Sequence, residues 1–123
     1  MSRVAVVQAA PVVFNRDRTL EIVADWTREA AADGAKLVLF PEAFVSAYPK
    51  GLDFGARVGM RTAAGRDDYL RYWDSAVDVP GPSVDRLGAI AKKHSVHLVI
   101  GVIERSAGTM YCTVLFFDPE GQL

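Results

Sequence analysis

The chain lacks several features that mark special classes of protein. Its 123 residues include one cysteine, Cys112, so no disulfide can form within it. A chain without disulfides suits the reducing cytosol, and we expect a cytoplasmic protein. The opening residues lead into a short apolar run that Gln8 interrupts, which is not the shape of a signal peptide. No apolar run approaches the roughly 18 residues of a membrane-spanning helix, so we expect no membrane partner.

An excess of charge of one sign is also missing. The chain has 14 Lys and Arg against 15 Asp and Glu, a formal net charge of -1, and its longest basic run is Lys92-Lys93. This balance gives no electrostatic reason to expect a nucleic acid partner. His94 and His97 are the two histidines, and two histidines without a third ligand do not make a metal site. No glycine pattern has the form of a phosphate-binding loop.

What remains is the composition of one globular domain. Apolar residues make up 50% of the chain and charged residues 24%, and this length suffices for one core. Arg3–Ala10 and Ala35–Phe40 are short, continuous apolar runs, which favour strands covered on both faces. Between them the spacing is helical, with Asn15 as N-cap and Gly34 as the stop. Strand, helix, strand in this order predicts a parallel pair with the helix crossing one face.

The second half continues the α/β pattern. Residues 66–76 favour a helix, and the turn "VPGPS" places Ser83 as the N-cap of another. Residues 96–105 and 110–118 read as strands joined by the turn "SAGT", which predicts a hairpin. The expected order is β-α-β, an irregular stretch with a helix, then α-β-β.

Glu42 is the residue that best fits a catalytic role. It follows a buried strand directly, after Pro41, and three apolar residues come next. Ligand sites gather at the carboxyl ends of strands in open α/β sheets. An acid held among apolar groups loses hydration of its charged form and takes up a proton more readily, as a general base near neutral pH requires. The competing interpretation is a solvated loop glutamate, and the residues alone leave both open.

Two further residues have weaker claims. Cys112 could be a nucleophile, but it lies inside the apolar run "MYCTVLFF", so we expect a buried, inert side chain. Tyr48 lies six residues after Glu42 and could line a pocket and donate a hydrogen bond, or it could be an ordinary loop aromatic.

The last residues suggest a continuing chain. "DPEGQL" has turn chemistry, and its final Leu123 begins a new apolar element. We therefore expect residues 1–123 to form a single, incomplete domain. If further strands cover the hairpin in the complete domain, as the resemblance described next implies, the isolated chain should expose apolar surface and associate.

These segments resemble one known family. "RVAVVQAAPV", "GAKLVLFPEAFVSAYPKG", "PGPSVDRLGAIAKKHSVHLVIGVIER" and "YCTVLFFDPEGQL" follow in the order found in the N-terminal portion of the nitrilase branch of the carbon–nitrogen hydrolase superfamily. The resemblance covers nearly the whole chain, and "LFPEAF" is its most specific part. It implies part of an α-β-β-α sandwich: a mixed sheet with helices packed on one face.

The resemblance also implies a mechanism. Family members use a Glu–Lys–Cys triad without metal or organic cofactor, so Glu42 would be the general base and Tyr48 a substrate contact. The substrate would be a small nitrile or amide, and the complete protein would form a homo-oligomer. The family's lysine and nucleophilic cysteine follow the "DPEG" turn, beyond Leu123, so this chain alone should be inactive. Cys112 precedes that turn and does not match the nucleophile.

Three alternatives stay open. The protein could be an amidase of the same superfamily, acting on carboxamides. It could be a natural truncated form that binds or co-assembles without catalysis. It could also be an unrelated α/β binding domain in which "FPE" is a coincidence.

Overall fold

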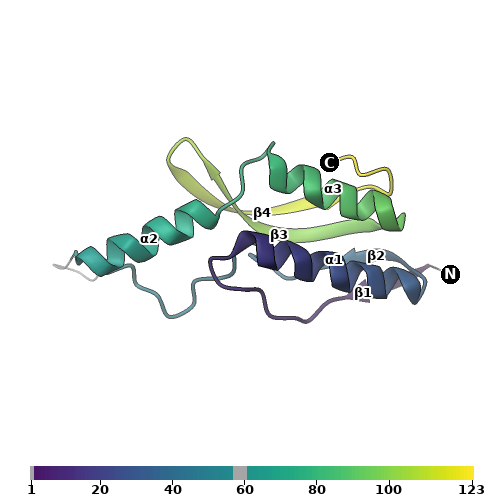
Figure 1. Ribbon diagram of the computed structural model, residues 1–123, viewed down its shortest axis with the longest axis horizontal. Coiled ribbons are helices and arrows are strands. Elements are labelled where there is room, and N and C mark those ends of the chain that lie inside the picture. Colours follow the sequence, from purple (N-terminus) through teal and green to yellow (C-terminus); the bar gives the residue numbers. More distant parts are fainter. Residues whose placement is uncertain (1, 57–60) are drawn as a thin grey trace.

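A computed structural model describes residues 2–56 and 61–123 of the chain (Figure 1). The order of helices and strands agrees with the predicted one. The elements are β1 (Arg3–Val6), α1 (Arg16–Ala32), β2 (Ala35–Leu39), α2 (Ala63–Ser75), α3 (Pro82–His94), β3 (His97–Ser106) and β4 (Thr109–Phe117). None of the helices in these ranges is long and apolar enough to cross a membrane.

The four strands form one mixed sheet in the order β1-β2-β3-β4. The first three run parallel, which the strand–helix–strand pattern predicted for β1 and β2, and β4 pairs antiparallel with β3. A two-residue turn closes the hairpin, with φ +47° at Ala107 and +85° at Gly108. Two consecutive positive φ values fit the twist of the flanking strands, which confirms the predicted hairpin.

One face of the sheet is covered by α1 and α3, which lie side by side in Figure 1. Alternate residues of β3 point into this layer and are fully buried. They pack against apolar stripes of both helices in one core that includes Leu20, Val23, Val38, Leu87, Leu98, Ile100 and Val102. The expectation of a mixed sheet with helices on one face is confirmed for these two helices.

The ends of α1 follow the predicted chemistry. The Asn15 side chain accepts a hydrogen bond from the Arg18 backbone N–H at 3.1 Å, and Gly34 has φ +84° just past the end. The predicted cap of α3 is wrong. That helix begins at Pro82, whose missing N–H costs nothing there, so Gly81 is the cap and Ser83 lies buried in the first turn.

The opposite face of the sheet is apolar and exposed. Register places Val6 beside Leu39, Leu39 beside Val99, and Val99 beside Phe116, so one row crosses all four strands. Phe116 at the end of this row is 65% exposed. We call this surface the open face, defined by Val4, Val6, Leu39, Val99, Val114 and Phe116.

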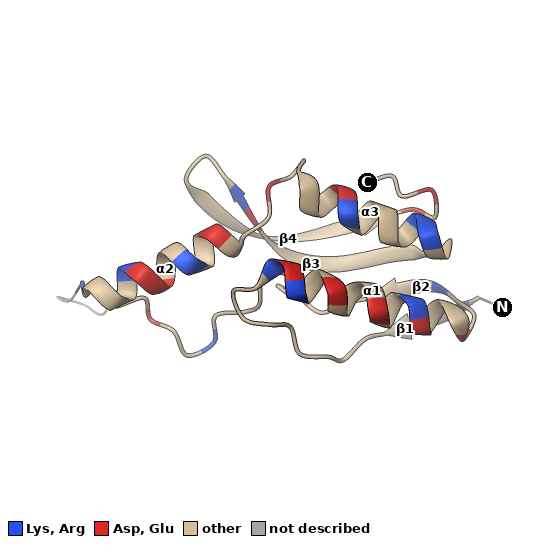
Figure 2. Cartoon of the chain, in the orientation of Figure 1, with Lys and Arg blue, Asp and Glu red and all other residues tan. Residues whose placement is uncertain are grey.

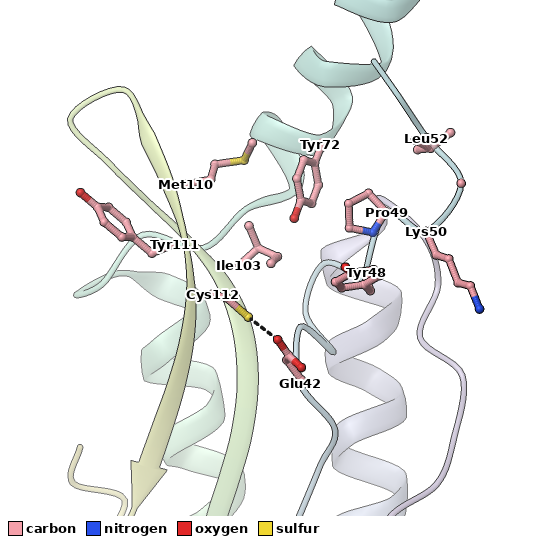
Figure 3. A pocket seen from close by; sticks show the side chains of 11 residues that line it. Glu42, Tyr48, Pro49, Lys50, Leu52, Tyr72, Ile103, Met110, Tyr111 and Cys112 are labelled. Carbon is pink, nitrogen blue, oxygen red and sulfur yellow. Dashed lines mark hydrogen bonds between the residues drawn. The ribbon is translucent and has the colours of Figure 1, made fainter. Parts of the chain in front are cut away.

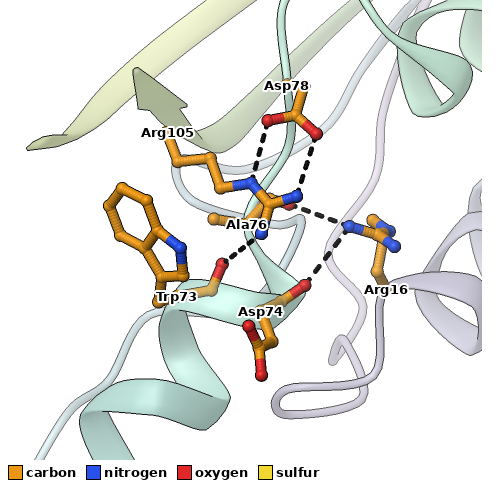
Figure 4. Close-up of polar contacts among 6 residues, drawn as sticks. All are labelled: Arg16, Trp73, Asp74, Ala76, Asp78 and Arg105. Carbon is orange, nitrogen blue, oxygen red and sulfur yellow. Dashed lines mark hydrogen bonds and ion pairs between the residues drawn. The ribbon is translucent and has the colours of Figure 1, made fainter. Parts of the chain in front are cut away.

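Helix α2 extends away from the sheet, and its C-terminal end is anchored to the body of the molecule (Figure 1). Arg105 of β3 binds both carboxylate oxygens of Asp78, at 2.8 and 2.9 Å, and donates to the Trp73 carbonyl at 3.2 Å (Figure 4). Arg16 donates to the Ala76 carbonyl at 2.9 Å. These contacts hold the last turn of α2 against the end of the sheet where Glu42 lies.

Charged side chains of both signs are spread along α1, α2 and α3, while most of the sheet is uncharged (Figure 2). Many of the ion pairs join side chains three residues apart on one helix, such as Arg28 and Asp25 at 2.7 Å. Such exposed pairs contribute little to stability. The mixed pattern agrees with the balanced charge of the sequence.

Candidate functional site

Glu42 lies just beyond the carboxyl end of β2, where the chain crosses over β3. The Gly101 N–H donates to the Pro41 carbonyl at 3.2 Å, and the Phe44 N–H donates to the Gly101 carbonyl at 2.9 Å. A Cβ at Gly101 would lie 2.6 Å from the Glu42 Cα, closer than real Cβ contacts. Glycine is therefore required at this point of β3, because the loop that carries Glu42 rests directly on its backbone.

The residues after Glu42 anchor this loop. Ala43, Phe44 and Val45 are all buried, and the Phe40 and Phe44 rings contact each other at 5.2 Å between centroids. The predicted apolar setting is thus present in the main chain around Glu42. The carboxylate itself is exposed in the described part of the chain. It projects from a fixed backbone into a surface pocket.

That pocket has a volume of about 480 Å³ (Figure 3). The loop after β2, the C-terminal half of α2 and the β3–β4 hairpin each contribute to its wall. Its lining residues are Glu42, Tyr48, Pro49, Lys50, Gly51, Leu52, Tyr72, Ile103, Met110, Tyr111 and Cys112. The predicted pair Glu42 and Tyr48 therefore share one pocket, with the Tyr48 side chain 64% exposed.

The expectation of a buried Cys112 is wrong, whereas the expectation of an unactivated thiol is not contradicted. Its side chain is exposed on β4, and its Sγ lies 3.2 Å from Oε1 of Glu42 (Figure 3). The predicted alternation along β4 is correct, but it places Cys112, Val114 and Phe116 on the open face. Loss of hydration raises the pKa of the Cys112 thiol, and the neighbouring Glu42 carboxylate raises it further.

Tyr72 is a pocket residue that the sequence did not single out. Its side chain is 8% exposed, and its ring lies 5.6 Å from both the Phe14 and the Phe54 rings, nearly parallel to the second. Burial raises the pKa of the Tyr72 phenol. Its aromatic neighbours in the sequence, Tyr69 and Trp73, lie outside this pocket, so spacing within α2 alone could not have selected it.

The histidines lie apart from this pocket. His94 ends α3 and His97 begins β3, as expected. Within residues 2–56 and 61–123, no three His, Cys, Asp or Glu side chains come together as metal ligands would.

Comparison with known proteins decides the family. Residues 3–123 match the sequence profile of the carbon-nitrogen hydrolases. The chain belongs to the carbon-nitrogen hydrolase family. This confirms the resemblance that the sequence motifs indicated.

Curated members of this family are similar along nearly the whole chain. A bifunctional nitrilase/nitrile hydratase of Nicotiana tabacum is 52% identical over 97% of the chain, and Nitrilase 3 of Arabidopsis thaliana is 50% identical over 98%. An aliphatic nitrilase of Sinorhizobium fredii is 47% identical over 97%. The matched parts are 34%, 35% and 39% of these relatives. The chain thus spans about a third of the length of the curated relatives it matches.

Solved carbon-nitrogen hydrolases share the fold. An amidase from Nesterenkonia sp. AN1, solved as a double mutant with acrylamide, has a TM-score of 0.68 at 20% identity, over 98% of this chain and 40% of its own. XC1258 from Xanthomonas campestris, a CN-hydrolase superfamily protein with an arsenic adduct in its active site, has a TM-score of 0.71 at 18% identity, over 97% and 37%. The predicted nitrilase-like α/β architecture is confirmed by these matches.

Proposed function

We propose that residues 1–123 form the first part of a single nitrilase-type hydrolase domain, in which Glu42 is the general base. The observation that carries this proposal is the placement of Glu42: its backbone is fixed on Gly101, and its carboxylate opens into a pocket of about 480 Å³. Relatives about half identical to this chain are named nitrilases. The overall reaction would convert a small nitrile and water to a carboxylic acid and ammonia.

The chemistry follows from the roles implied by the resemblance. Glu42 would take the proton of a cysteine thiol that lies outside residues 1–123, and the thiolate would add to the nitrile carbon. The proton would pass from Glu42 to the nitrile nitrogen, which gives a thioimidate and restores the carboxylate. Water then adds to this thioimidate and ammonia leaves, which gives a thioester. A second water, deprotonated by Glu42, releases the carboxylic acid and restores the thiol. Tyr48, at the mouth of the same pocket, would contact the substrate.

The open face of the sheet supports an incomplete domain. Its row of apolar side chains across four strands is longer than a monomeric soluble protein usually leaves uncovered. In an α-β-β-α sandwich, a second sheet would pack on this face. We further propose a cytoplasmic, homo-oligomeric complete protein. The intact mass of the protein from its source, measured by native and denaturing mass spectrometry, tests both completeness and assembly.

An amidase is the second candidate. It is favoured by the fold shared with an amidase solved with acrylamide. The two activities use the same base, so Glu42 does not distinguish them. Turnover of matched nitriles and amides, with ammonia as the readout, would separate the two activities.

The test of Glu42 needs a complete domain. A chimera supplies one if this chain replaces the matching third of the tobacco relative. Glu42→Gln keeps the size and shape of the side chain but cannot accept the proton, so activity should fall by at least about a hundredfold. Glu120→Gln, at an exposed turn away from the pocket, is the matched control. A Glu42→Gln chimera with near-normal turnover would overturn the proposed role.

A further inference from the structure

One side chain in the described part of the molecule hydrogen-bonds to Glu42, and it belongs to Cys112. The Sγ lies 3.2 Å from Oε1. The backbone N–H of Ala43, the next residue after Glu42, acts on the pKa of this thiol in the opposite direction to the carboxylate. The thiol therefore lies against the carboxylate of Glu42 and near the main chain that carries it.

The Cys112 thiol is suited to donate a hydrogen bond to Glu42. Partial loss of hydration and the adjacent carboxylate raise the pKa of Cys112, and the Ala43 N–H only partly opposes them. A thiol whose pKa is raised above its ordinary value keeps its proton at neutral pH. These are the properties of a hydrogen-bond donor rather than of an activated nucleophile.

Two adjacent strands thus fix Glu42 at different atoms. Gly101 of β3 supports its backbone, and Cys112 of β4 holds one carboxylate oxygen. Register makes this possible, because Cys112 pairs with Ile103 and Val114 pairs with Gly101, so Cys112 is a diagonal neighbour of Gly101 on the open face. With Oε1 occupied, Oε2 remains to accept a proton from a group in the pocket.

We propose that Cys112 is a positioning residue for the general base: its S–H holds Oε1 of Glu42, so that Oε2 is presented to the reacting groups. This inference rests on the proposed function of Glu42. A general base must lie within hydrogen-bond reach of the proton it abstracts, and a carboxylate that rotates freely spends much of its time in other orientations. A thiol is a weak donor, so it orients the carboxylate without strongly stabilising the charged form.

The first test uses the active chimera and three variants. Cys112→Ala should lower kcat about threefold to tenfold, the value of one hydrogen bond, while KM stays within about twofold. The carboxylate loses a donor, so the acidic limb of the kcat/KM profile should move to higher pH. Cys112→Ser should restore most of kcat and move that limb to lower pH, because a hydroxyl is a stronger donor.

Thr113→Ala is the matched control. Thr113 is the next residue of β4, and its hydroxyl donates to Glu104 at 2.8 Å. The Thr113→Ala variant therefore also loses a hydrogen bond to a glutamate, but this glutamate lies away from the pocket. Its kcat, KM and pH profile should be unchanged, and circular dichroism should show all variants folded.

Different results overturn different claims. Unchanged kcat and pH profile in Cys112→Ala would overturn the positioning role, and so would complete loss of turnover in both Cys112 variants, which would identify a nucleophile. If the parent chimera is inactive or Glu42→Gln stays active, the proposed function fails and the inference fails with it.

The contact itself is tested in the 123-residue chain without any activity. Cys112 is its single thiol, so the rate of reaction with iodoacetamide against pH reports on that residue alone. Glu42→Gln removes the negative charge beside the sulfur, so the thiol should titrate at lower pH. An identical titration in both proteins would show that the two side chains do not interact, which overturns the inference even if Glu42 proves catalytic.

Discussion

The two faces of the sheet differ in what covers them. The face under α1 and α3 buries Leu98, Ile100 and Val102 completely. The open face leaves Val6 and Phe116 exposed at the two ends of one row, although its composition is equally apolar. The helix-covered face has a finished core, whereas the open face has the composition of a core without its second layer.

The candidate chemistry lies at the boundary of the open face. Cys112 shares this face with Val114 and Phe116, and Glu42 crosses β3 beside it. The helix-covered face therefore supplies stability, and the open face presents the candidate reacting groups. Under the proposed function, the other groups of the site would come from outside residues 1–123.

The largest loss of stability is expected from a substitution on the face covered by α1 and α3. Ile100→Ala removes a fully buried side chain, and the lost contacts and cavity should lower the free energy of unfolding by about 2–5 kcal/mol. Phe116→Ser on the open face should change it by no more than about 0.5 kcal/mol. Urea titrations followed by circular dichroism measure both. Equal losses at the two positions would contradict the contrast between the faces.

The same Phe116→Ser variant should also reduce association of the isolated chain, because it removes one end of the exposed apolar row. Sedimentation velocity over a concentration series measures this. Association unchanged by the substitution would mean that copies meet through another surface.

A smaller loss of stability is expected at Gly101, where the loop that carries Glu42 rests on β3. Gly101→Val adds a side chain where a Cβ would already clash with the Glu42 backbone, and such overpacking should cost about 1–3 kcal/mol. It should also displace Glu42 from Cys112 and so lower the pH at which the thiol titrates. Ser106→Val, exposed on the same strand, is the control and should do neither. A stable Gly101→Val protein with an unchanged thiol titration would show that the loop does not need this close approach.

The smallest effect concerns the anchor of α2. Arg105 holds the pKa of Asp78 below its usual range through their hydrogen bonds. A carboxyl whose pKa is lowered on folding adds stability above its unfolded pKa, and that stability is lost as the pH falls through the folded value. Asp78 is half exposed, so Asp78→Asn should cost only about 0.2–1 kcal/mol at pH 7. The difference between the two proteins should disappear once the pH is below the folded pKa of Asp78, which lies under its usual value. A difference in the free energy of unfolding that persists in acid would show that Asp78 acts through packing and not through its charge.

Local chemistry made much of the fold predictable. Asn15 and Gly34 bound α1 because capping depends on residues within one turn, and the hairpin follows from the short "SAGT" segment. The prediction of Ser83 as the N-cap of α3 failed for the same local reason, since Pro82 can begin a helix just as well. Helical spacing alone would place Trp26 with the apolar residues of α1, yet it is 43% exposed because it lies at the rim of the buried stripe. That stripe is formed by Thr19, Leu20, Val23 and Thr27.

The site was only half predictable. Glu42 and Tyr48 share a short segment, so a strand end and its loop sufficed to place them together. The contact between Glu42 and Cys112 joins residues 70 apart in the chain. It depends on the loop crossing over Gly101 and on the pairing of β3 with β4, and no local pattern encodes both. Burial inferred from an apolar run also failed for Cys112, because a strand alternates and one of its faces here is open.

The order of strands in space is the order in which they are synthesised. Each strand that leaves the ribosome can therefore add to an edge that is already in place, and none has to insert between two others. β4 is the last to be added, and it carries Cys112 to a glutamate that was made 70 residues earlier. The carboxylate acquires its partner only when the fourth strand docks, so the pocket cannot be complete before β4 is in place.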